Sequence, residues 1–137
     1  MALEHYGTVE SVLLYTGVKP ADFGLTSTTG GDTAEQKLIS LITGWLKEAT
    51  DIIDRIIGGS YLDSDNVPPG LHNIAVRIVA NMCAQAILRR ETPVIRIGEF
   101  AVRMTDDTIV TPSIKRDLSR YTKRIPLRSF VPNLQED

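Results

Sequence analysis

Histidine and acidic side chains are the first places to look for chemistry in this 137-residue sequence. The two histidines are His5 and His72, and neither has a cysteine or a second histidine at the spacing of metal ligands. We therefore expect a structural or solvent-facing role for each. Residues 63–66, Asp-Ser-Asp-Asn, resemble the opening of a calcium loop, but Val67 and Pro68 replace the oxygen ligand and the glycine that should follow. A turn or a helix cap explains this segment better.

Motifs for covalent catalysis and for phosphate binding do not occur in the sequence. There is no Gly-x-Ser-x-Gly elbow, and neither glycine pair, at 30–31 or 58–59, is followed by the Lys-Ser or Lys-Thr of a phosphate-binding loop. Glu48, Asp51 and Asp54 fall on a polar helix face, where nothing indicates a paired acid and base. The sequence predicts a protein that is not an enzyme and that has no metal or other cofactor.

Basic side chains concentrate late in the chain, with Asp117 as the only acidic residue and Tyr121 interleaved among them. Such a cluster can contact phosphates or an acidic protein surface, or it can be a solvated helix face. The sequence leaves these three interpretations open. The cluster consists of Lys115, Arg116, Arg120, Lys123, Arg124 and Arg128.

Charge is unevenly distributed along the chain, although the net charge is only -2. Residues 1–70 carry ten acidic and four basic side chains, a net of -6, and residues 71–137 carry seven acidic and eleven basic ones, a net of +4. The small total argues against a general nucleic-acid or membrane binder. The acidic half of one molecule could attract the basic half of a second copy. The alternative is that the charged side chains simply form solvated faces.

The cysteine content and the apolar runs indicate where the protein works. Cys83 is the single cysteine, so there is no internal disulfide, and its apolar helical surroundings predict a buried, inert thiol. The longest apolar runs are too short to span a bilayer, and no secretion signal is recognisable. An intracellular, reducing origin without a membrane partner fits these features.

Hydrophobic periodicity predicts a mainly α-helical fold. A short helix is expected between Thr8 and Gly17, two long amphipathic helices over residues 33–57 and 69–90, and a last helix opening at Thr111 and Pro112. Residues 19–24 read as a turn or as one turn of helix. The two long helices, joined by a short loop, should pack as an antiparallel pair.

The remaining segments lack a helical period. Residues 1–7 read as a loose leader, and residues 94–104 alternate around Gly98-Glu99 as in a small β-hairpin. After Lys123 the prolines and scattered apolar residues predict an extended tail. We therefore expect one helical domain over residues 1–123, with the hairpin as an insertion, and a tail over residues 124–137.

Four elements, in this order, resemble the head–tail connector family of long-tailed phages and prophages, also called head-completion or adaptor proteins. An opening helix leads into residues 15–23, Tyr-Thr-Gly-Val-Lys-Pro-Ala-Asp-Phe. A long helix carries Trp45-Leu46, and the next long helix begins at Pro68-Pro69. A late helix over residues 114–121, Ile-Lys-Arg-Asp-Leu-Ser-Arg-Tyr, follows a β-like loop. The similarity covers residues 8–123 and rests on order and spacing.

This resemblance implies a structural virion protein. About a dozen copies would form a ring, a dodecamer, beneath the portal protein at the capsid vertex, and DNA would pass through the lumen without sequence-specific binding. The ring would offer a surface to a stopper or tail-completion protein. The protein would be made in the bacterial host cytoplasm and reside at the head–tail junction of the virion. The family has no catalytic residues to transfer.

A ring needs contacts between different patches on neighbouring copies, and three regions are candidates for them. These are the hairpin, the last helix and the tail. An alternative from another class is a small helical nucleic-acid-binding protein that uses the basic C-terminal helix; its position after a hairpin loop is unusual for a helix-turn-helix. The candidate interface residues are Arg96, Phe100, Arg103, Arg116, Arg120, Arg124 and Phe130.

Overall fold

The computed structural model describes residues 3–90 and 108–122. Within these ranges the chain is mainly helical and contains no strand. The helices are α1 (Val9–Thr16), α2 (Ala34–Ile57), α3 (Pro69–Arg90) and α5 (Pro112–Leu118), with short 3-10 helices η1 (Pro20–Phe23) and η2 (Ser119–Tyr121). The predicted bounds of α1, α2 and α3 are confirmed to within a residue, and α5 begins at Pro112 as predicted but continues from Ser119 as the 3-10 helix η2.

Local side-chain chemistry explains where the helices begin and end. The Thr8 hydroxyl accepts a hydrogen bond from the backbone N–H of Ser11 at 3.1 Å, and Gly17 closes α1 with a φ of 70°. Thr33 and Gln36 form a reciprocal capping box at the start of α2. Gly58 ends α2 with a φ of 78°, a conformation that costs least for glycine.

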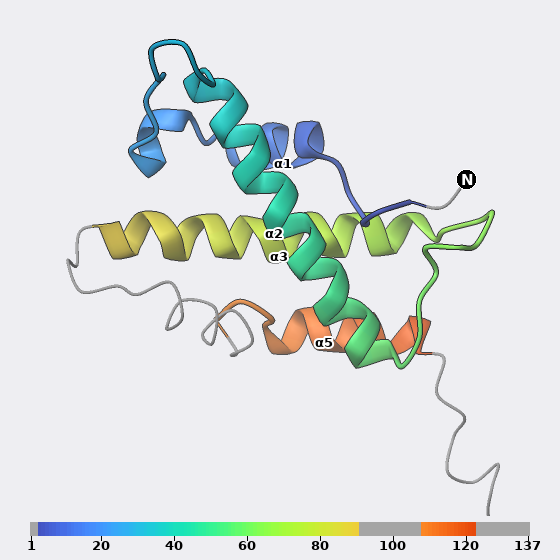
Figure 1. Cartoon of the computed structure of the whole chain (residues 1–137). Coiled ribbons are helices and arrows are strands. Elements are labelled where there is room, and N and C mark those ends of the chain that lie inside the picture. The colour runs from blue at the N-terminus through green and yellow to red at the C-terminus, as the bar shows by residue number, and fades with distance from the viewer. Residues whose placement is uncertain (1–2, 91–107, 123–137) are drawn as a thin grey trace, which may run out of the picture.

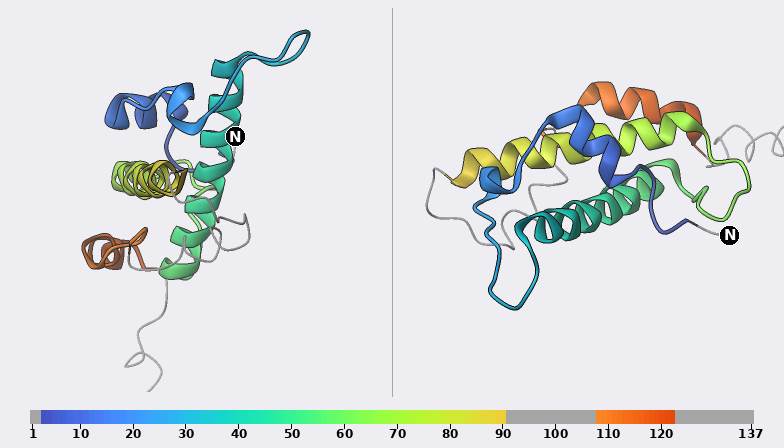
Figure 2. Two further views of the ribbon diagram at one scale, coloured as in Figure 1. Left: turned by 90° about the vertical axis from the view of Figure 1, so that its left-hand side faces the viewer. Right: turned by 90° about the horizontal axis from the view of Figure 1, so that it is seen from above.

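The helices form two layers. Helices α1, α3 and α5 lie side by side with α3 in the middle, and α2 crosses all three on one side (Figures 1 and 2). The prediction of an antiparallel pair is therefore wrong in its geometry, because α2 crosses α3 obliquely (Figure 1). The physical reason is that the apolar stripe of α2 is long enough to cover three helices, and an oblique crossing is needed to reach them all.

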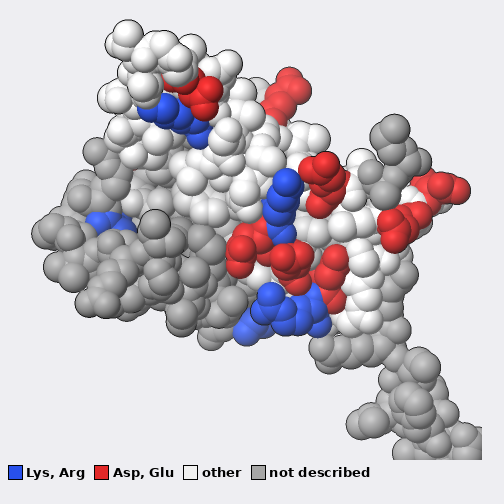
Figure 3. Space-filling model, viewed as in Figure 1, with Lys and Arg blue, Asp and Glu red and all other residues white. Residues whose placement is uncertain are grey.

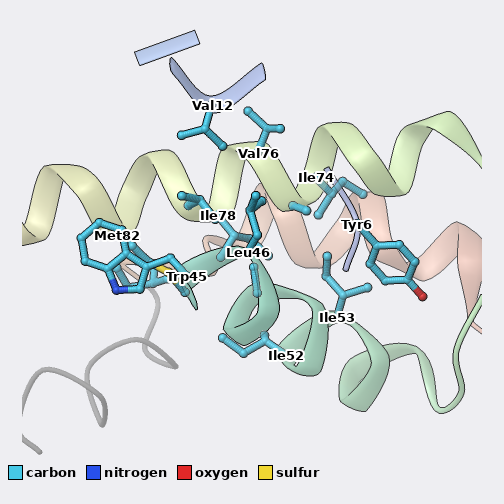
Figure 4. Packing of buried hydrophobic residues seen from close by; sticks show 14 of the residues in the cluster. Tyr6, Val12, Trp45, Leu46, Ile52, Ile53, Ile74, Val76, Ile78 and Met82 are labelled. Atoms are coloured by element: carbon cyan, nitrogen blue, oxygen red, sulfur yellow. The ribbon is translucent and has the colours of Figure 1, made fainter. Parts of the chain in front are cut away.

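The core lies between α2 and the three-helix layer. Leu46 and Ile53 project from α2 toward α3, and Val12 of α1 points toward Val76 of α3 (Figure 4). Trp45 is 9% exposed and meets Phe23 edge to face at 5.7 Å, so it belongs to the same core. Burial of each aliphatic side chain in this core, such as Leu46 or Ile53, stabilises the fold by about 1.5–3 kcal/mol relative to an exposed position.

Helix α3 is long and apolar enough, over Pro69–Arg89, to cross a membrane by length and composition. Its position explains the same composition. As the middle helix of the layer it packs against α1, α2 and α5, so more than one of its faces must be apolar. Leu71, Ile78, Val79 and Met82 are all completely buried within the protein.

The sequence also made predictions for three segments outside the four α-helices. The prediction of a loose leader is wrong for residues 3–7, because Tyr6 is completely buried and Gly7 is buried beside it. The hairpin of residues 94–104 lies outside the described residues. So does the tail of residues 124–137.

A candidate assembly surface on the last helix

Helix α5 is held to the rest of the domain by its inward-facing side chains. Ile114 and Leu118, one turn apart, are buried in the core. Tyr121, a further turn along in η2, lies against Gly70 at the start of α3; a Cβ atom at position 70 would come within 1.9 Å of its hydroxyl oxygen. The Thr122 hydroxyl donates to the backbone carbonyl of Ile57 at 3.2 Å. These contacts fix the orientation of the last helix.

A second row of α5 side chains faces Arg77 of α3. One guanidinium nitrogen of Arg77 lies 2.7 Å from Oδ2 of Asp117, and the other lies 3.3 Å from the Ser113 hydroxyl. The hydrogen bond from Arg77 lowers the pKa of Asp117, and the charges of Arg77, Arg120 and Arg116 lower it further. Asp117, the one acidic residue in the basic cluster, is thus engaged inside its own chain.

Arg116 of α5 and Arg120 of η2, the short 3-10 helix that continues α5, form a third row, which we call the α5 basic surface. Both are exposed, and helical geometry places them on the side of α5 opposite Ile114 and Leu118. They are one turn apart, so their charges reinforce each other, and Lys115 on the adjoining row is also exposed.

Arg116 and Arg120 are the two predicted interface residues that fall within the described part of the chain, and the structure brings them together on one surface. The other five lie outside the described residues, so their placement stays a prediction. They are Arg96, Phe100, Arg103, Arg124 and Phe130.

A polar cluster that the sequence did not reveal fastens residues 3–7 to α2 and α3. The backbone N–H of Tyr6 donates to the Thr50 hydroxyl at 2.9 Å, and the Tyr6 hydroxyl donates to Oδ1 of Asp54 at 2.7 Å. The same hydroxyl accepts a hydrogen bond from the backbone N–H of Tyr61 at 2.9 Å. Burial is the main cause that raises the pKa of Tyr6, and Asp54 adds to the shift.

His72 belongs to this cluster in a structural role, one of the two roles expected for it. The backbone N–H of Gly7 donates to Nδ1 of His72 at 2.8 Å, and the rings of Tyr6 and His72 meet edge to face at 6.2 Å. Accepting this bond requires the neutral imidazole with its proton on Nε2. Desolvation lowers the pKa of His72, and the charge of His5 lowers it further.

One local feature of the sequence points to this cluster. Tyr6 and Gly7 directly precede the N-cap Thr8, and an aromatic residue and a glycine in that place fit a chain that turns tightly against a core. Gly7 has a φ of 76°, and a Cβ atom there would lie 3.1 Å from a methyl group of Leu46. The pattern can be found locally, but its partners are more than forty residues away.

The described residues contain no group of three histidine, cysteine or acidic side chains that could hold a metal ion. Cys83 is buried, as predicted, and burial raises the pKa of its thiol to about 12. The polar groups around Tyr6 hold backbone atoms in place. The arrangement at α5 presents fixed positive charge to the outside, which suits the binding of an acidic surface.

Comparison with known proteins adds no relative to this description: no family model, no curated protein and no solved structure matches the chain.

Proposed function

We propose that the protein is a structural virion component, a ring-forming adaptor that joins the portal at the capsid vertex to the tail or stopper of a long-tailed phage. The order of the sequence elements supplies the resemblance to head–tail connectors. The α5 basic surface is the observation that carries the proposal. It is a pair of exposed arginines on a helix whose opposite side is anchored in the core.

An adaptor needs rigid surfaces, because a subunit that must fit between other subunits loses affinity if its contact groups have to be ordered on binding. The α5 basic surface satisfies this requirement. The inward-facing side of the helix is fixed in the core by Ile114, Leu118 and Tyr121. On the adjoining side Arg77 of α3 forms an ion pair with Asp117. The arginines themselves retain long side chains that can form bidentate pairs with carboxylates.

The partners of such an adaptor follow from its place. Copies of the same chain, in a ring of about twelve, would contact one another, the portal protein above and a stopper or tail-completion protein below. DNA would pass through the lumen without sequence-specific contact. The protein would act at the head–tail junction of the virion after synthesis in the bacterial cytoplasm, without a membrane partner or a cofactor.

Measurement of mass tests the proposal directly. The purified protein is analysed by native mass spectrometry alone and after mixing with purified portal rings. We expect a complex with about one adaptor subunit per portal subunit. Arg116→Glu/Arg120→Glu should reduce this complex without loss of helical content. Absence of any complex between the wild-type protein and portal rings contradicts the proposal.

The alternative is a small nucleic-acid-binding protein, favoured by the same two exposed arginines. Such a protein would bind duplex DNA with an affinity that falls steeply with salt, because each neutralised phosphate releases counterions. Binding of this kind, combined with failure to associate with portal rings, would select the alternative. Weak DNA binding and a portal complex support the adaptor.

A further inference from the structure

We infer that the α5 basic surface of one copy docks on an acidic surface on the outer side of α2 in the next copy. This inference deepens the proposed function and rests on it for the identity of the partner, a second copy of the chain. The contact joins two different surfaces. It is carried by the charges and the placement of α2 and α5 in the described part of the chain.

The α2 acidic surface consists of Glu48 and Asp51. Both are exposed, and helical geometry places them on the side of α2 opposite the buried Ile42, Leu46 and Ala49. Acidic side chains gather over the middle of the molecule on the face where α2 lies, and basic side chains border them on two sides (Figure 3).

The basic residues near these carboxylates do not cancel them. Lys47 pairs with Glu4 at 3.4 Å, so its charge is balanced by another carboxylate. Arg55 adds one positive charge a turn beyond Asp51, and Asp54, whose Oδ1 accepts the Tyr6 hydroxyl, adds one negative charge. Glu48 and Asp51 therefore leave the outer side of α2 acidic.

The two surfaces match in charge and in spacing. Glu48 and Asp51 are three residues apart on α2, a rise of about 4.5 Å, and Arg116 and Arg120 are four apart across the junction of α5 and η2, a rise of about 6–8 Å. Two arginines can therefore lie over two carboxylates when the helices meet face to face. Each pair in this arrangement is a charge-assisted contact of the geometry that guanidinium and carboxylate groups favour.

The two surfaces cannot meet within one molecule. The α2 acidic surface faces away from the three-helix layer, and α5 lies at the edge of that layer (Figure 2). Arg116 and Arg120 face away from the core on which α5 rests, because Ile114 and Leu118 face into it. A contact between unlike surfaces on neighbouring copies repeats from copy to copy and closes into a ring when the rotation per copy divides a full turn.

Charge reversal and mixing test this contact. The variants are Glu48→Arg/Asp51→Arg, with basic side chains on both surfaces, and Arg116→Glu/Arg120→Glu, with acidic ones on both. Sedimentation velocity at low ionic strength measures self-association. Each variant alone should associate about tenfold or more weakly than the wild type, because attraction becomes repulsion.

Mixing separates this contact from a general charge effect. An equimolar mixture of the two variants should recover association, since every contact between unlike variants restores opposite charges. The single chain that carries all four substitutions should recover it too. A matched control, Asp63→Arg/Asp65→Arg, makes the same change in net charge on an exposed loop and should leave association unchanged. Unaffected single variants, or a mixture no better than its components, overturn the inference.

A disulfide experiment tests the same contact without altering its charges. Gly44 lies one turn before Glu48, and a Cβ atom there meets nothing within 4 Å, while Ser119 is exposed next to Arg120. Gly44→Cys and Ser119→Cys proteins, mixed and oxidised, should cross-link to each other more than to themselves. The buried Cys83 gives a low background. Cross-links that form only between identical variants indicate a contact between like surfaces and overturn the inference.

Portal binding distinguishes failure of this inference from failure of the proposed function. If self-association does not follow the charge pattern while the wild-type protein still binds portal rings, the contact is wrong and the adaptor function stands. If self-association follows the charge pattern and portal rings are never bound, the contact stands and the adaptor function is wrong.

Discussion

The hydroxyl of Tyr6 donates a hydrogen bond of 2.7 Å to Oδ1 of Asp54, near the end of α2 and 48 residues away in the chain. The same oxygen accepts the backbone N–H of Tyr61 at 2.9 Å, in the loop that follows α2. One side chain thus fastens the N-terminal segment both to a helix and to the loop beyond it.

Removal of this hydroxyl should destabilise the protein measurably. Tyr6→Phe leaves the Tyr61 N–H without its acceptor, and we expect a loss of about 1–2 kcal/mol in the free energy of unfolding. Tyr6→Ala also opens a cavity in the core and should cost about 3–5 kcal/mol. Urea denaturation monitored by circular dichroism measures both. Tyr15→Phe is the control, because Tyr15 is 65% exposed; equal effects at the two positions contradict the role of Tyr6.

Stability should fall as the solution becomes acidic, because His72 must be neutral to accept the Gly7 N–H. The folded protein binds the proton less readily than the unfolded chain, since the pKa of His72 is lowered from its ordinary 6.5. The stabilisation of the folded protein by neutral His72 is therefore complete above pH 6.5. It is lost as the pH falls below 6.5 toward the lowered pKa of His72 in the folded protein.

Denaturation series across this pH range measure the effect. His72→Asn retains an acceptor oxygen near the position of Nδ1 and does not titrate. We expect this variant to lose part of the pH dependence while keeping most of the stability at neutral pH. An unchanged pH dependence in His72→Asn would show that the titration of other groups dominates.

Gly70 and Gly44 provide a matched pair of glycine substitutions. In Gly70→Ala the new methyl group meets the Tyr121 hydroxyl oxygen at 1.9 Å, so the tyrosine must move and the docking of η2 weakens. We expect the free energy of unfolding of Gly70→Ala to fall by about 1–3 kcal/mol. In Gly44→Ala the new methyl group meets nothing within 4 Å on an exposed helix position. This substitution should raise the free energy of unfolding by up to about 1 kcal/mol.

Thermal unfolding compares the two glycine variants. Tyr121→Leu, combined with Gly70→Ala, should recover much of the loss because the rigid phenol is gone. A Gly70→Ala protein as stable as the wild type would show that Tyr121 does not need its present position.

Removal of all residues after Lys123 should leave the helices folded. The buried residues that hold α5, Ile114 and Leu118, precede the cut, and so does the hydrogen bond from the Thr122 hydroxyl to the Ile57 carbonyl. Far-ultraviolet circular dichroism should show the same molar helical signal for the truncated and the full-length protein. A large loss of helix would place the tail within the core. Loss of portal binding alone would make it part of an interface.

Local chemistry made most of the helical bounds predictable. Thr8, Thr33 and Thr111 cap the helices that follow them, and Gly17 and Gly58 end the helices that precede them. These interactions span only a few residues, so they are visible in the sequence. The proximity of Arg116 and Arg120 was predictable for the same reason, since they are four residues apart in a predicted helix, although the structure places Arg120 in η2.

The attachment of residues 3–7 could not be predicted in the same way. Tyr6, Thr50 and Asp54 are unremarkable polar residues until the fold brings them together. The oblique crossing of α2 was also hidden, because periodicity shows which face of a helix is apolar and leaves open how many helices that face will cover.

The helices, their caps, the buried cysteine and the concentration of positive charge on the last helix follow from the order of residues, because each depends on neighbours in the chain. The crossing of α2 over a layer of three helices, the attachment of the N-terminal segment through Tyr6 and His72, and the ion pair of Arg77 with Asp117 arise only in the folded protein. These contacts join residues 40 to 65 positions apart. Their energies depend on packing geometry, which the order of residues along one helix does not contain.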